Sequence, residues 1–180
     1  MSKPLSRKFY QRDTLLVAEK LLGCFLIRQY KGKVYRARIT EVEAYVGEDD
    51  LACHASKGKT KRTEVMYGEA GHTYVYLIYG MYYCFNIVTE LKDFPAAILV
   101  RAVVIDDVPV KETNGPGKLC RFLKIDKTCN TLDLTKGNKL WVETGKKKKG
   151  EKVVKSKRIG VDYAEHCKEF LWRFELVRKK

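Results

Sequence analysis

Residues 34–45 have the sequence VYRARITEVEAY, and they predict one long strand around which the rest of the chain can assemble. Successive side chains of a strand point to opposite faces, so the odd-numbered residues share one face. That face carries Tyr35, Ala37, Ile39, Glu41, Glu43 and Tyr45. A carboxylate beside Ile39 and Tyr45 would be partly desolvated, which raises its proton affinity and suits it to general-base chemistry on a bound water. The alternative is that both acids pair with arginines on neighbouring strands.

Six more segments have the alternation or the apolar composition of strands, and together they predict a curved, mostly antiparallel sheet. These strands are predicted over residues 25–28, 73–79, 82–89, 96–105, 139–143 and 170–177. Turns at Lys31-Gly32 and at Gly80-Met81 would form two hairpins. Arg101 interrupts the apolar segment 96–105, and a buried arginine must pair with an acid or face a ligand pocket.

Helices are predicted only at the periphery of this sheet. Asp13 can cap a helix that Gly23 ends, and residues 115–117, Gly-Pro-Gly, lead into a short helix over residues 118–125. Residues 48–71 are polar and contain three glycines, so they predict a long ordered loop, which usually has a functional reason. Since no linker or internal repeat divides the chain, the sequence predicts a single α+β domain over residues 1–180.

The chain is strongly basic, because 36 Lys and Arg against 22 Asp and Glu give a formal net charge of +14. A field of this sign attracts polyanions, so nucleic acid is the first partner to test. A solvated face of lysines is the alternative explanation. Eight of the basic residues fall within residues 145–158, a run that predicts a mobile surface loop, a specific DNA contact or a localisation signal.

The six cysteines have no spacing that predicts a zinc site. Their thiols are expected to be free and buried, as in a reducing compartment. No apolar stretch reaches the roughly 18 residues that a membrane span requires. The sequence therefore predicts a soluble, intracellular protein without a metal centre and without a membrane partner.

Tyrosine is concentrated between residues 74 and 83, where five occur around Gly80. Burying so many hydroxyl groups would require many polar partners. Their rings could instead stack on nucleic-acid bases, each stack contributing roughly 1–3 kcal/mol. A ring at the tip of the hairpin could also wedge into a duplex.

These segments resemble the alkyladenine (3-methyladenine) DNA glycosylase family, the methylpurine DNA glycosylases. The resemblance is specific and runs in order through nearly the whole chain. It rests on EVEAYVG at 41–47, DLACH at 50–54, Arg62, Met66-Tyr67, YVYLIYGMY at 74–82, Asn86, LVRA at 99–102, GPGKLC at 115–120 and RIG at 158–160.

The resemblance implies a monofunctional enzyme of base excision repair that needs neither a metal nor an organic cofactor. Its partner would be double-stranded DNA that contains alkylated or deaminated purines. A β-hairpin would intercalate from the minor groove, the damaged nucleotide would flip out, and water would hydrolyse the N-glycosidic bond to leave an abasic site. Such an enzyme is expected to act as a monomer on the DNA inside the cell, in the nucleus of a eukaryote or in the cytoplasm and nucleoid of a prokaryote.

Site residues are carried over from the family by position. Glu43 resembles the general base that orients the attacking water, and Arg101 would be a further holder of that water. Tyr45, His54 and Tyr76 resemble the residues that stack on the flipped base. The backbone amide of His54 would recognise the edge of the purine. Asn86 matches the position that rejects normal guanine by crowding its 2-amino group.

The residues expected to contact DNA follow from the same resemblance. Tyr79 matches the intercalating residue, and Met81 and Tyr82 would line the groove beside it. Lys118 and Arg158 are also expected to bind DNA. The chain departs from the family in two places. The segment 103–114 is shorter than expected, and residues 163–167 stand where the family has a pattern that contains glycine and tryptophan.

Two other functions remain open from the sequence. A non-catalytic basic DNA-binding module would use the same tyrosines and lysines and would not need Glu43. A base deaminase also flips nucleotides, but it requires a zinc-bound water held by a set of His and Cys ligands. The cysteine spacing argues against the deaminase.

Overall fold

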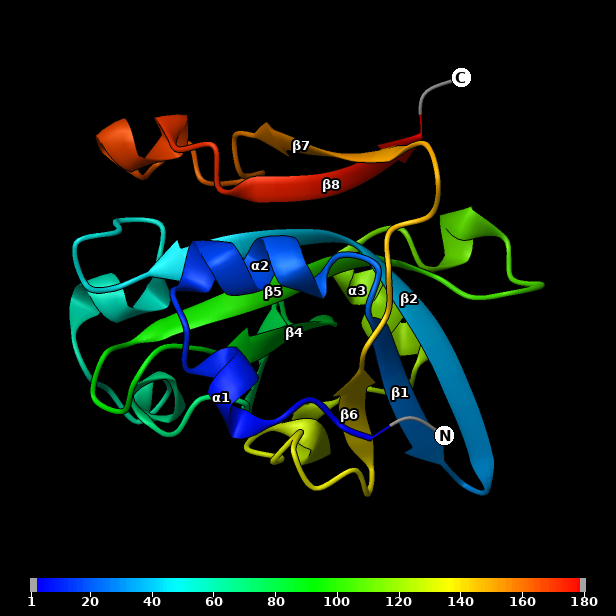
Figure 1. Ribbon diagram of the computed structural model, residues 1–180. Coiled ribbons are helices and arrows are strands. Elements are labelled where there is room, and N and C mark those ends of the chain that lie inside the picture. Colours follow the sequence, from blue (N-terminus) through cyan, green and yellow to red (C-terminus); the bar gives the residue numbers. More distant parts are fainter. Residues whose placement is uncertain (1–2, 179–180) are drawn as a thin grey trace.

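The strand predicted at residues 34–45 lies at the centre of the computed structural model, which describes residues 3–178 (Figure 1). This strand, β2 (Lys33–Val46), pairs along one edge with β5 (Ala96–Val104). Along its other edge, the first half pairs with β1 (Phe25–Tyr30) and the second half with β8 (Arg173–Arg178). β2 therefore joins parts of the sheet that lie far apart in the sequence.

The strands form a curled antiparallel half-barrel, which confirms the predicted α+β fold. The order is β3 (Thr73–Ile78), β4 (Tyr82–Val88), β5, β2, β1 and β6 (Leu140–Glu143), and β7 (Glu151–Ser156) pairs with β8. The two predicted hairpins, β1 with β2 and β3 with β4, are both present.

The helices are short and lie around the sheet, as predicted. They are α1 (Arg7–Tyr10), α2 (Thr14–Leu21) and α3 (Pro116–Phe122), together with the 3-10 turns η1 (His54–Lys57), η2 (Glu64–Tyr67), η3 (Val110–Glu112), η4 (Lys127–Cys129) and η5 (Glu165–Glu169). Asp13 caps α2, because its carboxylate accepts a hydrogen bond of 2.8 Å from the amide of Leu16. α3 begins at Pro116, two residues before the prediction, because proline is well suited to the first helical position. In residues 3–178, no helix combines the length and apolar character that crossing a bilayer would need.

One face of the sheet packs against α2 and α3 and forms the main hydrophobic core. Alternate residues of neighbouring strands point into it. They include Val75 of β3, Phe85 and Ile87 of β4, Ile98 and Val100 of β5, and Val42 and Ala44 of β2. The residues between them therefore point to the opposite side of the sheet.

The alternation of β2 is interrupted in its middle, which corrects the predicted arrangement of its faces. The register against β5 shifts between Ile39 and Glu41 and again between Glu41 and Val42. Ile39 before the shifts and Val42 and Ala44 after them pack in the same core. The prediction that Ile39 shares a face with Glu41 and Glu43 is therefore wrong, because a bulge turns the following side chains to the other face. Both acids lie on the side of the sheet that faces away from the main core.

The basic run at residues 145–158 contains a strand that the sequence did not predict. Glu151–Ser156 forms β7 and pairs with β8 over its whole length, so the prediction of a mobile surface loop is wrong for this part. Val153 packs against the main core, while Lys152 and Lys155 are exposed. Over residues 145–158 the lysines outnumber the apolar residues, so the composition of this segment does not predict a strand. The pairing with β8 specifies it instead.

The chain between β6 and β7 passes close to the end of α2. A Cβ atom added at Gly145 would overlap the backbone of Gly23 and Cys24. We expect Gly145→Ala to lower the free energy of unfolding by about 2–3 kcal/mol, because neither backbone segment can move without displacing α2 or β1. Urea denaturation measures this change. Lys149→Ala, at an exposed position of the same segment, should change stability by less than about 0.5 kcal/mol, and equal stabilities for the two variants would contradict the tight packing.

Candidate active site

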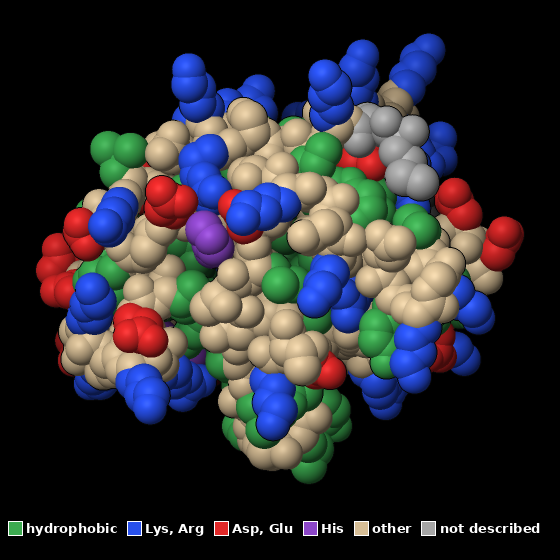
Figure 2. Space-filling model, turned by 90° about the horizontal axis from the view of Figure 1, so that it is seen from below, with side chains coloured by type: hydrophobic (Ala, Val, Ile, Leu, Met, Phe, Trp, Pro, Cys, Tyr) green, Lys and Arg blue, Asp and Glu red, His purple; other side chains and the backbone are tan. Residues whose placement is uncertain are grey.

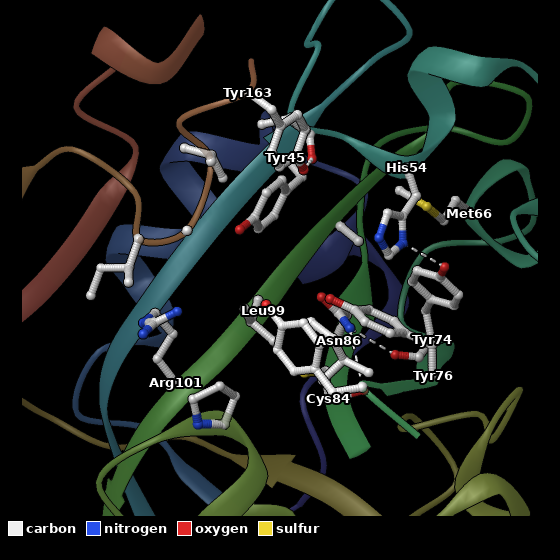
Figure 3. Close-up of a pocket in the computed structure, with 18 residues that line it drawn as sticks. Tyr45, His54, Met66, Tyr74, Tyr76, Cys84, Asn86, Leu99, Arg101 and Tyr163 are labelled. Carbon is white, nitrogen blue, oxygen red and sulfur yellow. Dashed lines mark hydrogen bonds between the residues drawn. The ribbon is translucent and has the colours of Figure 1, made fainter. Parts of the chain in front are cut away.

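A pocket lies on the side of the sheet that faces away from the main core (Figure 3). Its cavity is about 220 Å³. Four neighbouring strands supply much of its lining through the residues that alternate with core positions. These are Tyr45 of β2, Tyr74 and Tyr76 of β3, Cys84 and Asn86 of β4, and Ala97, Leu99 and Arg101 of β5.

The sheet register alone brings two of the predicted site residues, Glu43 and Asn86, into one row of side chains. Tyr74 pairs with Asn86, Asn86 with Leu99, Leu99 with Glu43, and Glu43 with Arg173. Residues directly opposite in an antiparallel sheet have Cβ atoms roughly 4.5–5.5 Å apart. The five side chains therefore form one row across five strands. Tyr74, Asn86 and Leu99 line the pocket, and Glu43 and Arg173 continue the row behind its wall.

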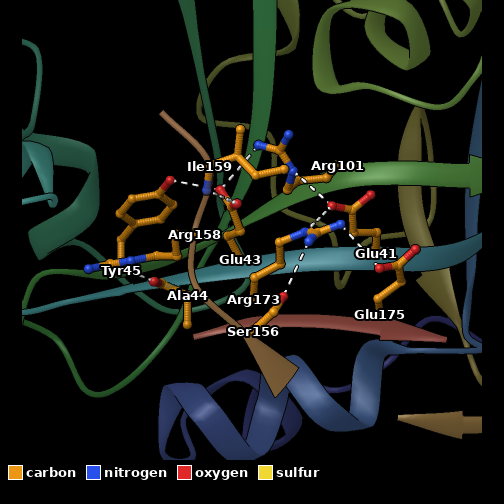
Figure 4. A network of polar contacts seen from close by, with 10 residues as sticks. All are labelled: Glu41, Glu43, Ala44, Tyr45, Arg101, Ser156, Arg158, Ile159, Arg173 and Glu175. Atoms are coloured by element: carbon orange, nitrogen blue, oxygen red, sulfur yellow. Dashed lines mark hydrogen bonds and ion pairs between the residues drawn. The ribbon is translucent and has the colours of Figure 1, made fainter. Parts of the chain in front are cut away.

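Glu43 is completely buried, and three groups hold its carboxylate (Figure 4). The hydroxyl of Tyr45 donates to Oε2 over 2.9 Å, and Nη1 of Arg101 donates to the same oxygen over 3.2 Å. The backbone amide of Ile159 donates to Oε1 over 2.8 Å. All three partners line the pocket, so Glu43 lies immediately behind its wall. A carboxylate offers about four acceptor positions, which leaves capacity for one more donor.

Aromatic rings face each other across the pocket. Figure 3 shows Tyr45 on one side and His54 with Tyr76 on the other. The His54 and Tyr76 ring centroids are 4.6 Å apart in an edge arrangement. Burial, and next the charge of Glu43, raise the pKa of Tyr45 well above its usual value. The Tyr45 hydroxyl therefore remains a hydrogen-bond donor to Glu43.

His54 is the first residue of η1, in the long loop, and its ring forms a hydrogen bond with a tyrosine of β3. Its Nδ1 lies 2.8 Å from the hydroxyl of Tyr74. Burial, and then the positive charge of Arg62, lower the pKa of His54 to about 4. The imidazole is therefore neutral at pH 7, with one donor and one acceptor nitrogen, and the contact with Tyr74 engages Nδ1.

Asn86 is buried at the pocket floor in a fixed orientation. Its Nδ2 donates to the backbone carbonyl of Tyr74 over 3.0 Å. Turning the amide would break this hydrogen bond, so the side chain stays in place. It therefore limits the space that a ring bound in the pocket can occupy.

Arg158 is placed differently from the expected DNA contact. Its side chain is buried, and its two terminal nitrogens donate to Asp50 over 2.6 and 2.8 Å. Its guanidinium carbon lies 4.8 Å from the ring centroid of Tyr45 and 5.0 Å from that of Trp172. A buried side chain cannot reach a phosphate unless this ion pair breaks, at a cost of about 3–5 kcal/mol. In this structure the Arg158 side chain points inward to Asp50 and Tyr45 and not to the surface.

The hairpin of β3 and β4 ends beside the pocket in a tight turn. β3 ends at Ile78, one residue before the prediction, and Tyr79 occupies the turn with a φ of +53°. This left-handed conformation costs a bulky residue of the order of 1–3 kcal/mol. Tyr79 is also 83% exposed, and Met81 and Tyr82 beside it are exposed at 66% and 46%. With most of its surface exposed, the Tyr79 ring contributes little to the packing of the hairpin.

Basic side chains lie on both sides of the pocket. Lys57 and Arg62 line a groove that shares His54 with the pocket. On the other side, Arg121 and Lys124 line a groove beside the hairpin tip. Lys118 is exposed in the first turn of α3, and residues 146–149 line neither groove. Figure 2 shows that basic side chains project around the face seen from below, interspersed with acids.

Several residues of the site were not predicted as site residues from the sequence. Tyr163 is 68% exposed and lines both the pocket and the groove beside His54, yet the sequence marked it only as part of a departure from the family pattern. Ile159 holds Glu43 through its backbone amide, and such a contact does not depend on the residue type. Asp50 belongs to a matching motif, but its pairing with Arg158 requires the folded chain.

The six cysteines are free and buried, which confirms the prediction for them. Burial raises the pKa of Cys53 to about 12, so its thiol stays protonated. Among residues 3–178, no group of three or more His, Cys, Asp and Glu side chains is arranged to hold a metal ion.

The fold and the site define a class of protein. A curled sheet encloses an aromatic pocket, a buried acid stands behind the wall, and an exposed ring caps a hairpin between basic grooves. These features are typical of the class of enzymes that act on a base extruded from nucleic acid.

Comparison with known proteins identifies the family. The sequence model of the methylpurine-DNA glycosylase family matches residues 8–180. A relative from Clostridium acetobutylicum is 42% identical over 98% of this chain and 95% of its own length. Relatives from Sodalis glossinidius and Legionella pneumophila (strain Corby) are 48% and 46% identical, over 95% and 98% of this chain and 95% and 93% of their own lengths. All three carry the name "Putative 3-methyladenine DNA glycosylase". The chain belongs to the methylpurine-DNA glycosylase family, which confirms the resemblance found in the sequence.

We expect the His54 ring to titrate with a midpoint near pH 4. Because burial and Arg62 lower its pKa from 6.5 to about 4, the neutral ring favours the folded state. This contribution to stability is present above pH 6.5 and is lost as the pH falls towards 4. NMR titration of the histidine rings measures the midpoint, with the His54 signal assigned by its absence from His54→Gln. A midpoint near 6.5 would show that the ring is solvated instead.

Proposed function

We propose that this protein is a DNA glycosylase that removes alkylated or deaminated purines from double-stranded DNA by hydrolysing the N-glycosidic bond. The main support is Glu43, a fully buried carboxylate held by three pocket-lining groups directly behind an aromatic cavity. Membership of the methylpurine-DNA glycosylase family and the net charge of +14 support DNA as the substrate. The enzyme would act as a monomer on the DNA of the cell.

Binding would begin with extrusion of the damaged nucleotide. The sugar carbon C1′ is shielded inside a duplex, and a damaged or mispaired base costs less to unstack than a normal one. Tyr79 would enter the gap, and Met81 and Tyr82 would line the minor groove beside it. Their exposure at the hairpin tip supports these roles. Lys118 would meet the phosphate backbone from the first turn of α3.

The flipped purine would stack between Tyr45 on one side and His54 with Tyr76 on the other. Aromatic stacking is worth roughly 1–3 kcal/mol per base, and it is strengthened when the base carries a positive charge, as ring-methylated purines do. The anchored amide of Asn86 would crowd the 2-amino group of normal guanine and disfavour that base.

Hydrolysis would use one carboxylate and one water. Glu43 would accept a proton from the water while the water oxygen bonds to C1′ and the bond from C1′ to the purine nitrogen breaks, its electron pair leaving with the base. The negative charge of Glu43 would also stabilise the oxocarbenium-like transition state. Nη2 of Arg101 makes no hydrogen bond within residues 3–178, and Arg101 lines the pocket, so this nitrogen could hold the attacking water.

We expect Glu43→Gln to slow base release by about 10²–10⁴-fold while affinity for lesion-containing DNA is retained, because only the proton acceptor is lost. The assay measures release from separate duplexes that contain 3-methyladenine, 7-methylguanine, hypoxanthine or ethenoadenine. Glu151→Gln, which replaces another acid paired with an arginine, is the control and should keep the wild-type rate. If wild type and Glu43→Gln release base at the same rate, the proposed role of Glu43 fails. If both bind the duplexes and neither releases base, the protein is a DNA-binding module.

We expect Tyr79→Ser to reduce the population of the flipped state about tenfold, because the gap in the duplex loses a stack of roughly 1–3 kcal/mol. Fluorescence of an ethenoadenine-containing duplex reports on unstacking. Leu77→Ser is the matched control, since Leu77 is 44% exposed on the same hairpin and does not line the pocket. Equal effects of the two substitutions would argue against a wedge at position 79.

A further inference from the structure

A network of charged side chains runs behind the pocket from β5 to β8 (Figure 4). Oε1 of Glu41 accepts a hydrogen bond of 3.0 Å from Nε of Arg101 and one of 2.6 Å from Nε of Arg173. Arg173 also donates to Ser156 over 3.2 Å and to Glu175 over 3.1 Å. Glu41 therefore connects the pocket residue Arg101 to the two strands β7 and β8.

Stability alone is a poor explanation for this network. The side chain of Glu41 is 8% exposed and that of Arg101 is 14% exposed. Removing charges from water costs several kcal/mol per ion, and well-packed apolar residues often stabilise such a position more than an ion pair does. A buried ion network that contacts the catalytic carboxylate points instead to a role in the chemistry.

We propose that Glu41 is a positioning residue that keeps Arg101 from forming a two-pronged ion pair with Glu43. The hydrogen bond from Nε of Arg101 to Glu41 fixes the plane of the guanidinium. In this orientation only Nη1 reaches Glu43, over 3.2 Å. One acceptor position of Glu43 thus stays open towards the pocket, and Nη2 of Arg101 stays available there.

Without Glu41, Arg101 is free to turn and bind both oxygens of Glu43, the geometry that arginine prefers with a carboxylate. That pairing neutralises the acid and occupies the position that the water needs. The inference rests on the proposed function, because it concerns the state of Glu43 during base release.

The positive charge of Arg173, on β8, balances the negative charge of Glu41. Removing Arg173 should therefore have the opposite electrostatic effect on Glu43 from removing Glu41. Several charged or titratable groups face Glu43 from the elements around it. They are Glu41 and Tyr45 of β2, Cys84 of β4, Arg101 of β5, Arg158 after β7, and Arg173 of β8. Glu41→Gln removes one negative charge from the surroundings of Glu43, and Arg173→Gln removes one positive charge.

The test is the pH dependence of single-turnover base release by wild type, Glu41→Gln and Arg173→Gln. Glu41→Gln should slow release at least about tenfold, since Arg101 is no longer held in place. Its acid limb should move to lower pH by about half to one unit, because the remaining acid ionises more easily beside an unshared arginine. In Arg173→Gln the acid limb should move to higher pH by a similar amount.

Glu151→Gln is the matched control, because Glu151 pairs with Arg38 over 2.6 Å and both side chains are buried to a similar degree. It should lower the melting temperature as Glu41→Gln does, without moving the pH profile. Glu41→Asp keeps the charge but shortens the side chain, so it should slow release without shifting the pH profile. It replaces Glu41→Gln in the test if that variant does not fold.

The outcomes separate the two proposals. An active wild type, together with unshifted profiles for Glu41→Gln and Arg173→Gln, overturns the role of Glu41 and leaves the glycosylase function intact. Shifts of the same sign in both variants also overturn it. A wild type that releases no base from any of the four lesion duplexes overturns the proposed function and the role of Glu41 with it.

Discussion

The register shifts between β2 and β5 are the feature on which the site depends. They leave Ile39 in the main core while turning Glu41, Glu43 and Tyr45 to the other side of the sheet. With regular alternation, the two acids would share the face of Ile39 and would enter a core of aliphatic side chains. Unpaired charges in such a core cost several kcal/mol each. The bulge thus converts one strand from a packing element into the wall of a pocket.

The second requirement is that three separate parts of the chain meet at Glu43. Tyr45 comes from the same strand, Arg101 from β5 and the amide of Ile159 from the segment after β7. The β7–β8 ribbon also supplies Arg173, and the segment after β7 supplies Arg158, which supports Tyr45 from behind. The C-terminal part of the chain is therefore as necessary to the pocket as the central strand. In a site that excludes water, such fixed hydrogen bonds act more strongly than in solution.

The pocket and the hairpin tip have contrasting physical properties. The pocket is built on strands, and hydrogen bonds hold the polar side chains of Tyr45, His54 and Asn86. Tyr79 is exposed and sits in a strained backbone conformation, and Met81 and Tyr82 next to it line a groove with Arg121 and Lys124. A rigid cavity suits the selection of a base, whereas an exposed ring suits insertion into a duplex. The two parts share the strands β3 and β4, so the pocket and the hairpin tip are mechanically connected.

Local patterns in the sequence were sufficient to predict most strands, both hairpins, the Asp13 cap and the pairing of Glu41 and Glu43 with an arginine on a neighbouring strand, because periodicity, turn residues and misplaced charges are properties of short segments. The bulge in β2, the strand β7 and the buried position of Arg158 could not be predicted in this way. Each depends on hydrogen bonds to a strand or side chain far away in the sequence. The amide of Ile159 is the clearest case, because a backbone donor is the same for nearly every residue type and only the closed fold aims it at Glu43.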